Sequence, residues 1–234
     1  MVICLETSTL LCSVALCDAN GIVALRESSE NKSHASRLTV FIEELLSEAG
    51  LRVGDLDAVA VSKGPGSFTG LRIGVSTAKG LAFAGSIPLI GIETTLSMFH
   101  GIDETIKRKY GIDKTSLFVP MLDARRMEVY YSILTSEGKS IKQISAEIID
   151  ERSFSDIPEN VRMLIFGDGA SKCKQVLKGG NIVFADEFRM SAAYMYEPAF
   201  KSLRERQFED IAYFEPFYLK DFITSRPKKN ILGR

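Results

Sequence analysis

The chain has 234 residues, of which 45% are hydrophobic and 25% are charged, so it holds enough apolar content for one large domain or two smaller lobes. Its 29 basic and 30 acidic residues give a net charge of −1, which excludes a global electrostatic attraction for a polyanion. No apolar run approaches the roughly 18 residues of a membrane span, and the first residues lack a signal-peptide pattern. We therefore expect a cytoplasmic protein that makes no membrane contact.

The first fifty residues predict three strands followed by a helix. Strands are expected at 2–5, 11–17 and 22–26, and the dipeptide Asn20-Gly21 is typical of a tight hairpin between the last two. Ser33 can cap the next helix, in which apolar residues recur at helical spacing: Leu38, Phe41, Ile42, Leu45, Leu46 and Ala49. The segment 6–9 lies between the first two strands, where its hydroxyl groups either donate to a phosphate or form a polar turn.

Residues 58–92 hold the densest motif. A strand at 58–61 runs into a glycine-rich turn, and a helix of small residues follows at about 70–84, with Ser67 or Thr69 as its N-cap. Such a helix N-terminus can seat an anion, so Gly64, Gly66 and Ser67 are candidate phosphate-binding residues. Close helix packing explains the same glycines equally well. The P-loop pattern fails here, and a dinucleotide pattern survives only weakly because Thr69 stands where it needs Gly or Ala.

The second half repeats the order of elements. After a strand at 89–92 and a helix at 94–110, the pattern predicts strands near 117–122, 127–135 and 141–149, a short helix near 153–157, a strand at 162–166, a helix at 170–178, a strand at 182–184 and a helix at 191–206. We predict an α/β fold of two lobes, each βββαβαβα, that face each other across a cleft. The lobes are 1–110 and 111–222, the last helix being free to pack back on the first lobe. A basic tail, 223–234, is either frayed or a weak RNA contact.

Few residues offer catalytic or metal-binding chemistry. The two histidines, His34 and His100, lie in no nucleophile motif and are wrongly spaced for a metal pair. Asp123 ends a predicted strand and is the best single carboxylate for a general base, although a turn or an ion pair with Arg125 explains it more simply. The four cysteines form no Cys-x-x-Cys pair, so we interpret them as buried thiols.

Four segments resemble the TsaB family, a bacterial subunit of the machinery that makes threonylcarbamoyladenosine in tRNA. The longest begins at Lys63-Gly-Pro-Gly-Ser-Phe-Thr-Gly-Leu-Arg and ends at Lys79-Gly-Leu-Ala; the others are Glu6-Thr7-Ser8-Thr9, Asp123-Ala-Arg-Arg-Met-Glu-Val-Tyr130 and Pro216-Phe-Tyr-Leu-Lys220. Together they span nearly the whole chain. The resemblance implies the actin-like, sugar-kinase-like ATPase fold, in which each lobe is of the ribonuclease-H-like type.

The resemblance also implies a non-catalytic scaffold subunit. TsaD, a catalytic paralogue of similar fold, carries a His-x-x-x-His metal pair where this chain has Thr94 and Met98, so we expect neither a metal nor a catalytic residue here. Glu6 replaces the family's usual Asp, which counts against a magnesium or nucleotide role at that turn. The candidate nucleotide-binding residues, with ATP or ADP bound within a complex, are Glu6, Thr7, Ser8, Thr9, Gly64, Gly66 and Ser67.

The expected partners also follow from the family. They are a TsaD-like catalytic subunit, a TsaE-like ATPase in the same complex, tRNA reached through that complex, and a second copy of the chain when it is alone. The complex transfers threonylcarbamoyl to the adenosine next to the anticodon of ANN-reading tRNAs. We expect the helices at 35–49 and 70–84 to form the protein interface, with Arg37 and Arg72 at its rim. Its central contacts are Phe41, Ile73, Thr77 and Gly80.

Two other classes of function stay open on the residues alone. An autonomous ATP-dependent phosphotransferase of the actin-like superfamily requires nucleotide turnover by the isolated chain, and the missing acidic and histidine clusters argue against it. A dinucleotide-dependent oxidoreductase requires the weakened glycine motif to hold NAD.

Overall fold

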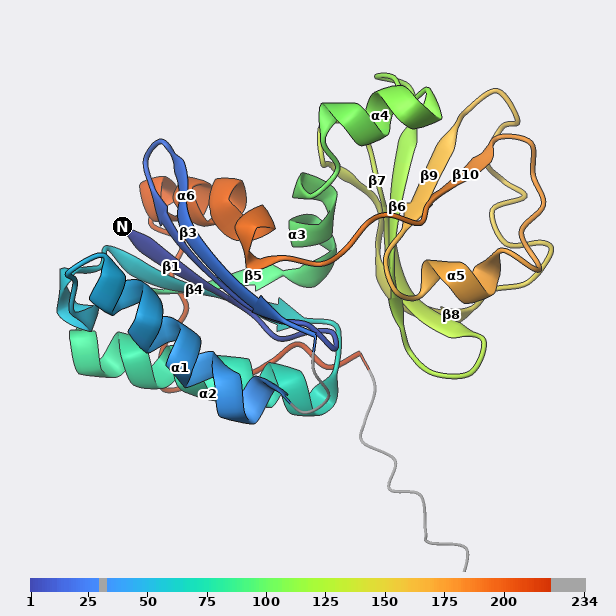
Figure 1. Ribbon diagram of the computed structural model, residues 1–234. Helices are drawn as coiled ribbons and strands as arrows, with labels where there is room; N and C mark the ends of the chain where they lie inside the picture. Colours follow the sequence, from blue (N-terminus) through green and yellow to red (C-terminus); the bar gives the residue numbers. More distant parts are fainter. Residues whose placement is uncertain (30–32, 220–234) are drawn as a thin grey trace, which may run out of the picture.

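The computed structural model describes residues 1–29 and 33–219, except for the side chain of Ser33, and forms two α/β lobes side by side (Figure 1). The first half contains β1 (Val2–Glu6), β2 (Cys12–Asp18), β3 (Gly21–Ser28), α1 (Ser33–Glu48), the 3₁₀ turn η1 (Val53–Asp55), β4 (Ala58–Gly64), α2 (Phe68–Gly85), β5 (Leu89–Glu93), α3 (Thr94–His100) and α4 (Glu104–Tyr110). The second half contains β6 (Leu117–Asp123), β7 (Glu128–Leu134), β8 (Ser140–Ile148), β9 (Met163–Phe166), α5 (Ala170–Cys173), β10 (Ile182–Ala185), the 3₁₀ turn η2 (Ala192–Met195) and α6 (Tyr196–Glu205).

The two sheets have the same topology. Their strand orders are β3-β2-β1-β4-β5 and β8-β7-β6-β9-β10. In each sheet the first three strands in sequence pair antiparallel, and the last two continue the sheet in parallel on the other side of the first strand. The α/β fold class is therefore confirmed. The predicted order βββαβαβα holds in the first half, whereas in the second half turns replace the helix expected between β8 and β9.

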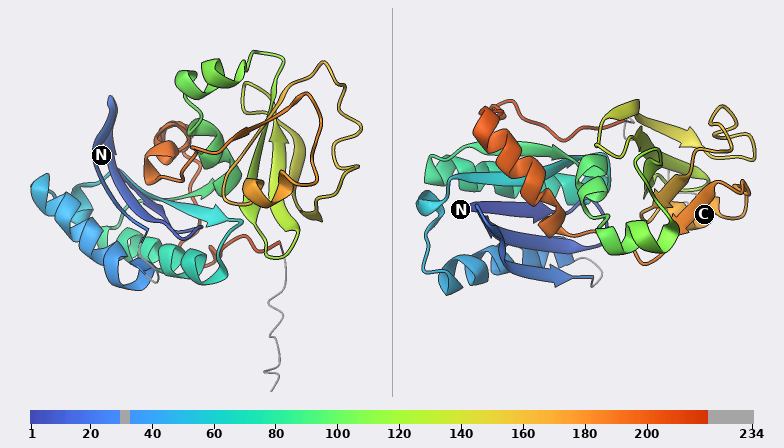
Figure 2. Two further views of the ribbon diagram at one scale, coloured as in Figure 1. Left: turned by 45° about the vertical axis from the view of Figure 1, so that its right-hand side comes forward. Right: turned by 90° about the horizontal axis from the view of Figure 1, so that it is seen from above.

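Helices are exchanged between the two lobes. Helices α1 and α2 cover one face of the first sheet, but its other face packs against η2 and α6, which come from the end of the second half (Figures 1 and 2). The second sheet is covered on one side by α5 and the turns at 149–161, and on the other by α3 and residues near α4. Each lobe thus depends on a segment from the other half of the chain to bury its sheet on both faces.

Local sequence signals explain where several elements begin and end. The Ser67 side chain caps α2 by accepting a hydrogen bond from the amide of Gly70 (3.2 Å), as predicted. The two residues between β2 and β3 form the turn of the expected hairpin. The four cysteines are buried and form no disulfide bond. No helix within residues 1–29 and 33–219 is both long and apolar enough to cross a membrane.

Three predicted helices differ from the structure. The helix expected at 94–110 is broken into α3 and α4, because Asp103 caps a new helix by accepting from the amide of Ile106 (2.8 Å). Residues 153–157 form turns instead of a short helix, and the helix expected at 170–178 ends at Cys173. The predicted N-cap role of Ser33 concerns a side chain that lies outside the described residues. The predicted basic tail, 223–234, also lies outside them.

Candidate functional site

The N-terminus of α2 lies against the turn that follows β1. The amide of Ser67 donates to the carbonyl oxygen of Ser8 at 2.6 Å. A Cβ atom on Gly66 would overlap Ser8, and one on Gly70 or Gly74 would overlap Thr7. The glycines of this segment therefore allow two stretches of backbone to pack closely. A phosphate at this helix terminus stays a prediction, and it requires the turn at 7–8 to move.

Glu6 is fully buried beneath this contact. One of its carboxylate oxygens accepts hydrogen bonds from the amide of Ser8 (2.6 Å) and the hydroxyl of Ser62 (3.0 Å), whereas the other has no partner among the described residues. Burial raises the pKa of Glu6, and the hydrogen bonds from Ser8 and Ser62 oppose that rise. Glu6 therefore holds the turn after β1 against β4 through buried hydrogen bonds. The hydroxyls of Thr7 and Ser8 are likewise buried without a partner in residues 1–29 and 33–219.

A cavity of ≈ 460 Å³ separates the two lobes near this turn. The first lobe contributes Thr9 and its neighbours 10–11, and the second contributes Gly167, Asp168 and Arg189. Thr9 is the one candidate nucleotide-binding residue that lines the cavity. The other six lie at the packed contact between the turn at 6–8 and the loop at 64–67, so the structure does not bring the set to one open site.

A C-terminal segment, 207–219, crosses the glycine loop and α2, which the sequence did not predict. The amide of Phe217 donates to the carbonyl oxygen of Lys63 at 2.6 Å, and the ammonium of Lys63 pairs with Glu209 at 3.3 Å. Lys79 donates to the carbonyl oxygens of Ala212 (3.2 Å) and Phe214 (3.0 Å). The two lysines of the longest family-like segment therefore hold this C-terminal segment in place.

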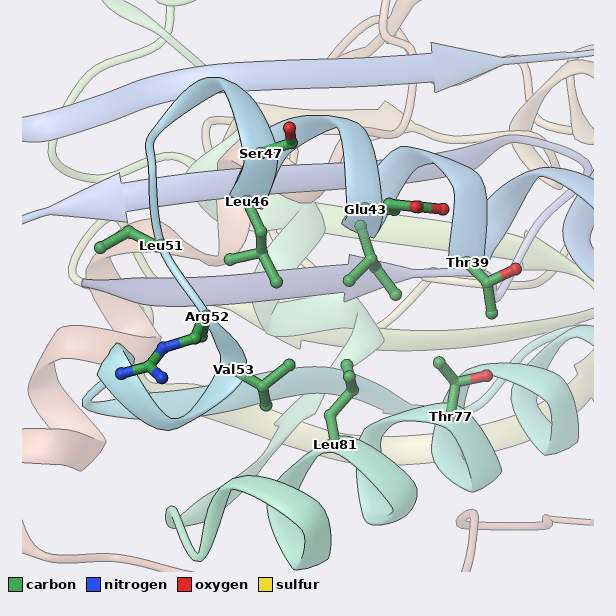
Figure 3. Close-up of a pocket in the computed structure, with 10 residues that line it drawn as sticks. Thr39, Glu43, Leu46, Ser47, Leu51, Arg52, Val53, Thr77 and Leu81 are labelled. Atoms are coloured by element: carbon green, nitrogen blue, oxygen red, sulfur yellow. The ribbon is translucent and has the colours of Figure 1, made fainter.

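A groove of ≈ 570 Å³ runs between α1 and α2 on the outer face of the first lobe. Figure 3 shows side chains from both helices pointing toward one another across it. We call it the α1–α2 groove, and its lining residues are Thr39, Ile42, Glu43, Leu46, Ser47, Leu51, Arg52, Val53, Thr77 and Leu81. Half of these residues are apolar, three carry hydroxyl groups and two, Glu43 and Arg52, are charged, a mixture that is compatible with a protein interface.

The predicted interface residues take three kinds of position. Thr77 lines the groove, and Gly80 is exposed with open space around its Cβ position. Arg37 is exposed, and Arg72 lies over the ring of Phe68, 4.2 Å from its centroid. In contrast, Ile73 is half-buried against the core of the first lobe, and Phe41 is only 8% exposed within it.

Sequence reasoning missed the residues that form most of the groove wall. Leu81 is half-buried on α2, and Leu51 and Val53 come from the connection between α1 and β4. The signal available for Leu81 was its place four residues after Thr77 on the same helical face. Leu51 and Val53 had no periodic signal, because they lie outside the helices.

Asp123 and the histidines have structural partners. The Asp123 carboxylate pairs with Lys172 and accepts from the amide of Arg125 at 2.9 Å, so it acts as a turn acceptor and its ion pair is with Lys172. His34 contacts the carbonyl oxygen of Leu11 at 3.1 Å, and His100 lies 2.9 Å from Glu197. Among the described residues, no three His, Cys, Asp or Glu side chains gather as they would around a metal.

Comparison with known proteins places these features in a family. The model of the family TsaD, described as tRNA N6-adenosine threonylcarbamoyltransferase, matches residues 22–221. The "tRNA threonylcarbamoyladenosine biosynthesis protein TsaB" of Haemophilus influenzae is 29% identical over 229 residues, covering 94% of this chain and 93% of the relative. The protein of the same name from Escherichia coli is 29% identical over 232 residues, covering 95% and 96%.

The chain belongs to the TsaD family, on its TsaB branch. A crystal structure from Pseudomonas aeruginosa, described as an uncharacterized protein with similarity to peptidase YEAZ, has a TM-score of 0.79 at 24% identity and covers 94% of this chain and 99% of that one. That likeness shows the fold alone. The predicted membership of the TsaB family and the predicted actin-like, two-lobed fold are both confirmed.

Proposed function

We propose that this chain is a non-catalytic subunit of a tRNA threonylcarbamoyltransferase complex. It takes part in tRNA threonylcarbamoyladenosine biosynthesis, as the names of its TsaB relatives indicate. Its own role is to bind a TsaD-like catalytic subunit and support the transfer of threonylcarbamoyl to the adenosine next to the anticodon of ANN-reading tRNAs. A cytoplasmic location is part of this proposal, because the substrate is tRNA.

The α1–α2 groove is the observation that supports this role. It is a depression of ≈ 570 Å³ between two outer helices, lined on α2 by the half-buried side chains of Thr77 and Leu81, and Gly80 is exposed on the same helix. Helices of a partner that pack into such a groove would bury apolar surface. Each Å² of apolar surface removed from water stabilises the complex by about 25 cal/mol. The same face serves a TsaD-like subunit or, in its absence, a second copy of the chain. A TsaE-like ATPase completes the complex.

Arginine substitutions in the groove test this proposal. Thr77→Arg and Leu81→Arg place a long charge between packed helices, which should weaken association with the native catalytic subunit by about 3 kcal/mol, on the order of 100-fold. Thr105→Arg is the matched control, because Thr105 is an exposed threonine on α4, away from the groove. Association is read by analytical ultracentrifugation, and tRNA modification by mass spectrometry of digested tRNA. Normal association of both groove variants would place the interface elsewhere.

The alternative of an autonomous ATP-dependent phosphotransferase makes the opposite prediction for the isolated chain. The proposed role requires that purified chain neither modify tRNA nor hydrolyse ATP above a mock preparation. In this proposal ATP or ADP binds only within the complex, because in the isolated chain the turn at 7–8 packs against the N-terminus of α2. Turnover that survives purification and is lost on Glu6→Gln or Asp123→Asn would refute the non-catalytic role.

A further inference from the structure

The turn between β6 and β7 holds two arginines in an unusual backbone conformation. Arg125 and Arg126 have φ angles of 70° and 50°, in the left-handed region that side chains other than glycine rarely adopt. The turn, Ala124–Met127, lies at the end of the second sheet opposite α4 (Figure 1). We call it the arginine turn. Two consecutive strained residues persist only where surrounding contacts hold them.

Those contacts come from groups on both sides of the arginine turn. The amide of Arg125 donates to Asp123, and the amide of Asp123 donates to Asp168 at 3.1 Å. Lys172 pairs with the Asp123 carboxylate and also donates to the carbonyl oxygen of Glu128 at 2.6 Å. Asp123 and Lys172 therefore fix the two ends of the turn, and the backbone presents Arg125 and Arg126 outward.

The charges of the turn are not neutralised by the surrounding protein. Arg125 and Arg126 are exposed, and neither guanidinium forms an ion pair or a side-chain hydrogen bond with any residue of 1–29 or 33–219. Some cations of the same lobe are neutralised in this way, since Lys174 pairs with Asp186 and Lys142 pairs with Glu147. Two adjacent guanidinium groups on one turn can bind an anion together.

The shape of the turn selects the kind of anion. Residues 125–127 are all exposed and line neither the α1–α2 groove nor the cavity between the lobes, whereas sites for small ligands are concave and bury most of the ligand. Met127 is 37% exposed beside the arginines. Burial raises the pKa of the half-buried Tyr130 phenol, and the charge of Arg125 partly opposes that rise. Arginines next to apolar and aromatic groups suit an RNA strand, whose phosphates and bases alternate.

We propose that the arginine turn binds the phosphate backbone of the tRNA substrate. This inference rests on the proposed function, which supplies an RNA to the complex. A chain of net charge −1 has no global attraction for RNA, so a contact of this kind must be local. Guanidinium groups form bidentate hydrogen bonds with phosphate oxygens, and each neutralised phosphate releases counterions and makes binding depend on salt.

The test compares two pairs of arginines. Arg125→Gly/Arg126→Gly removes both guanidiniums and keeps the left-handed backbone, because glycine adopts positive φ freely. The control is Arg204→Gly/Arg206→Gly, in which both arginines are exposed at the end of α6 and Arg206 also has a positive φ of 53°. Binding of a labelled, unmodified ANN-reading tRNA is measured by fluorescence anisotropy from about 50 to about 200 mM salt, for the chain alone and for its complex with the catalytic subunit.

The arginine-turn variant should bind tRNA about tenfold more weakly at low salt, both alone and in the complex. The slope of log affinity against log salt concentration should also be shallower by about 1–2. The control should change affinity less than twofold. Arg125→Lys/Arg126→Lys should restore most of the affinity, since phosphate also accepts lysine as a point charge. Equal losses in both glycine pairs, or no loss in either, would overturn the proposal.

Association with the catalytic subunit separates this proposal from the proposed function. The arginine-turn variant should sediment with that subunit as the wild type does, because the α1–α2 groove is untouched. If the variant no longer associates with the catalytic subunit but, measured alone, binds tRNA as tightly as the wild type does, the turn contacts protein, and the RNA proposal is wrong. If the wild type binds no catalytic subunit, the proposed function fails, and the tRNA measurements on the isolated chain still decide the role of the turn.

Discussion

The amide of Ser67 and the carbonyl oxygen of Ser8 form a 2.6 Å hydrogen bond that joins the start of α2 to the turn after β1. Because of this contact, the helix N-terminus, which could otherwise attract an anion, is in contact with the chain itself. The glycines beside it are needed for the close approach of the two backbones. Their substitution should therefore affect stability before it affects any ligand.

Gly70→Ala should be strongly destabilising. The new Cβ would overlap the carbonyl oxygen of Thr7, a backbone atom that cannot rotate away, and such overpacking costs about 3 kcal/mol. Gly80→Ala is the matched control on the same helix, where the Cβ position is open, and it should raise the free energy of unfolding by about 0.5–1 kcal/mol. Urea unfolding of the monomeric protein measures both. Similar effects at the two sites would contradict the close contact at Gly70.

Glu6→Gln should change how stability depends on pH. Burial raises the pKa of Glu6 above its ordinary value of 4.5, so the folded protein binds this proton more tightly than the unfolded chain does. The stability linked to the proton is fully present below the unfolded pKa and is lost as the pH rises through the folded pKa. The variant has no such proton, and its amide oxygen can still accept from Ser8 and Ser62.

The difference in unfolding free energy should therefore shift in favour of the Glu6→Gln variant as the pH rises above 4.5, the ordinary pKa of this carboxyl group. Urea unfolding of both proteins at several pH values gives this difference. The contributions of other titrating groups, such as His100, are the same in both proteins and are removed by the subtraction. A difference that stays constant across the range would show that Glu6 titrates alike in the folded and unfolded states.

Lys79→Met should loosen the C-terminal segment 207–219. It removes the hydrogen bonds from the ammonium to the carbonyl oxygens of Ala212 and Phe214, and the loss of stability should be about 1–2 kcal/mol, since the site is partly exposed. Lys178→Met is the control, because Lys178 is exposed. Amide hydrogen exchange should accelerate across 207–219 in the first variant and not in the second. Unchanged exchange there would mean that Lys63 and the backbone contacts hold the segment alone.

Ser86→Gly should stabilise the protein by about 0.5–1 kcal/mol. Ser86 ends α2 with a φ of 52°, a left-handed conformation that glycine adopts without strain. Ser76→Gly, at an exposed position inside the same helix, should destabilise by a similar amount because glycine there adds only conformational entropy to the unfolded chain. Thermal or urea unfolding gives both changes, and the prediction requires them to have opposite signs.

Much of the fold could be predicted because its signals are local. Apolar runs and turn residues predicted most strands and their order along the chain, and the stripe that contains Leu38 and Phe41 identified α1. Where a signal depended on distant residues, prediction failed. The break between α3 and α4 combines a local signal that the prediction overlooked, the cap at Asp103, with a distant one, the packing of Gly101 against Tyr194.

The candidate site was predicted less well for the same reason. The sequence indicates that glycines surround Ser67, but it cannot show that Thr7 and Ser8 pack against them. Phe41 was expected in the interface although it belongs to the apolar stripe that faces the sheet, and the structure places it in the core. The contacts of Lys63 and Lys79 with the C-terminal segment join residues more than a hundred positions apart, for which no periodic pattern exists.

The exchange of helices between the lobes affects how the protein is made. A ribosome finishes the first sheet when β5 emerges, yet the face that includes Cys4, Ala60 and Ile90 stays open until α6 has been synthesised. At about 5–20 residues per second, this apolar face is exposed to the cell for several seconds. The nascent first lobe is therefore a natural client for a ribosome-associated chaperone, and the two halves cannot be separated into independent modules by cutting between them.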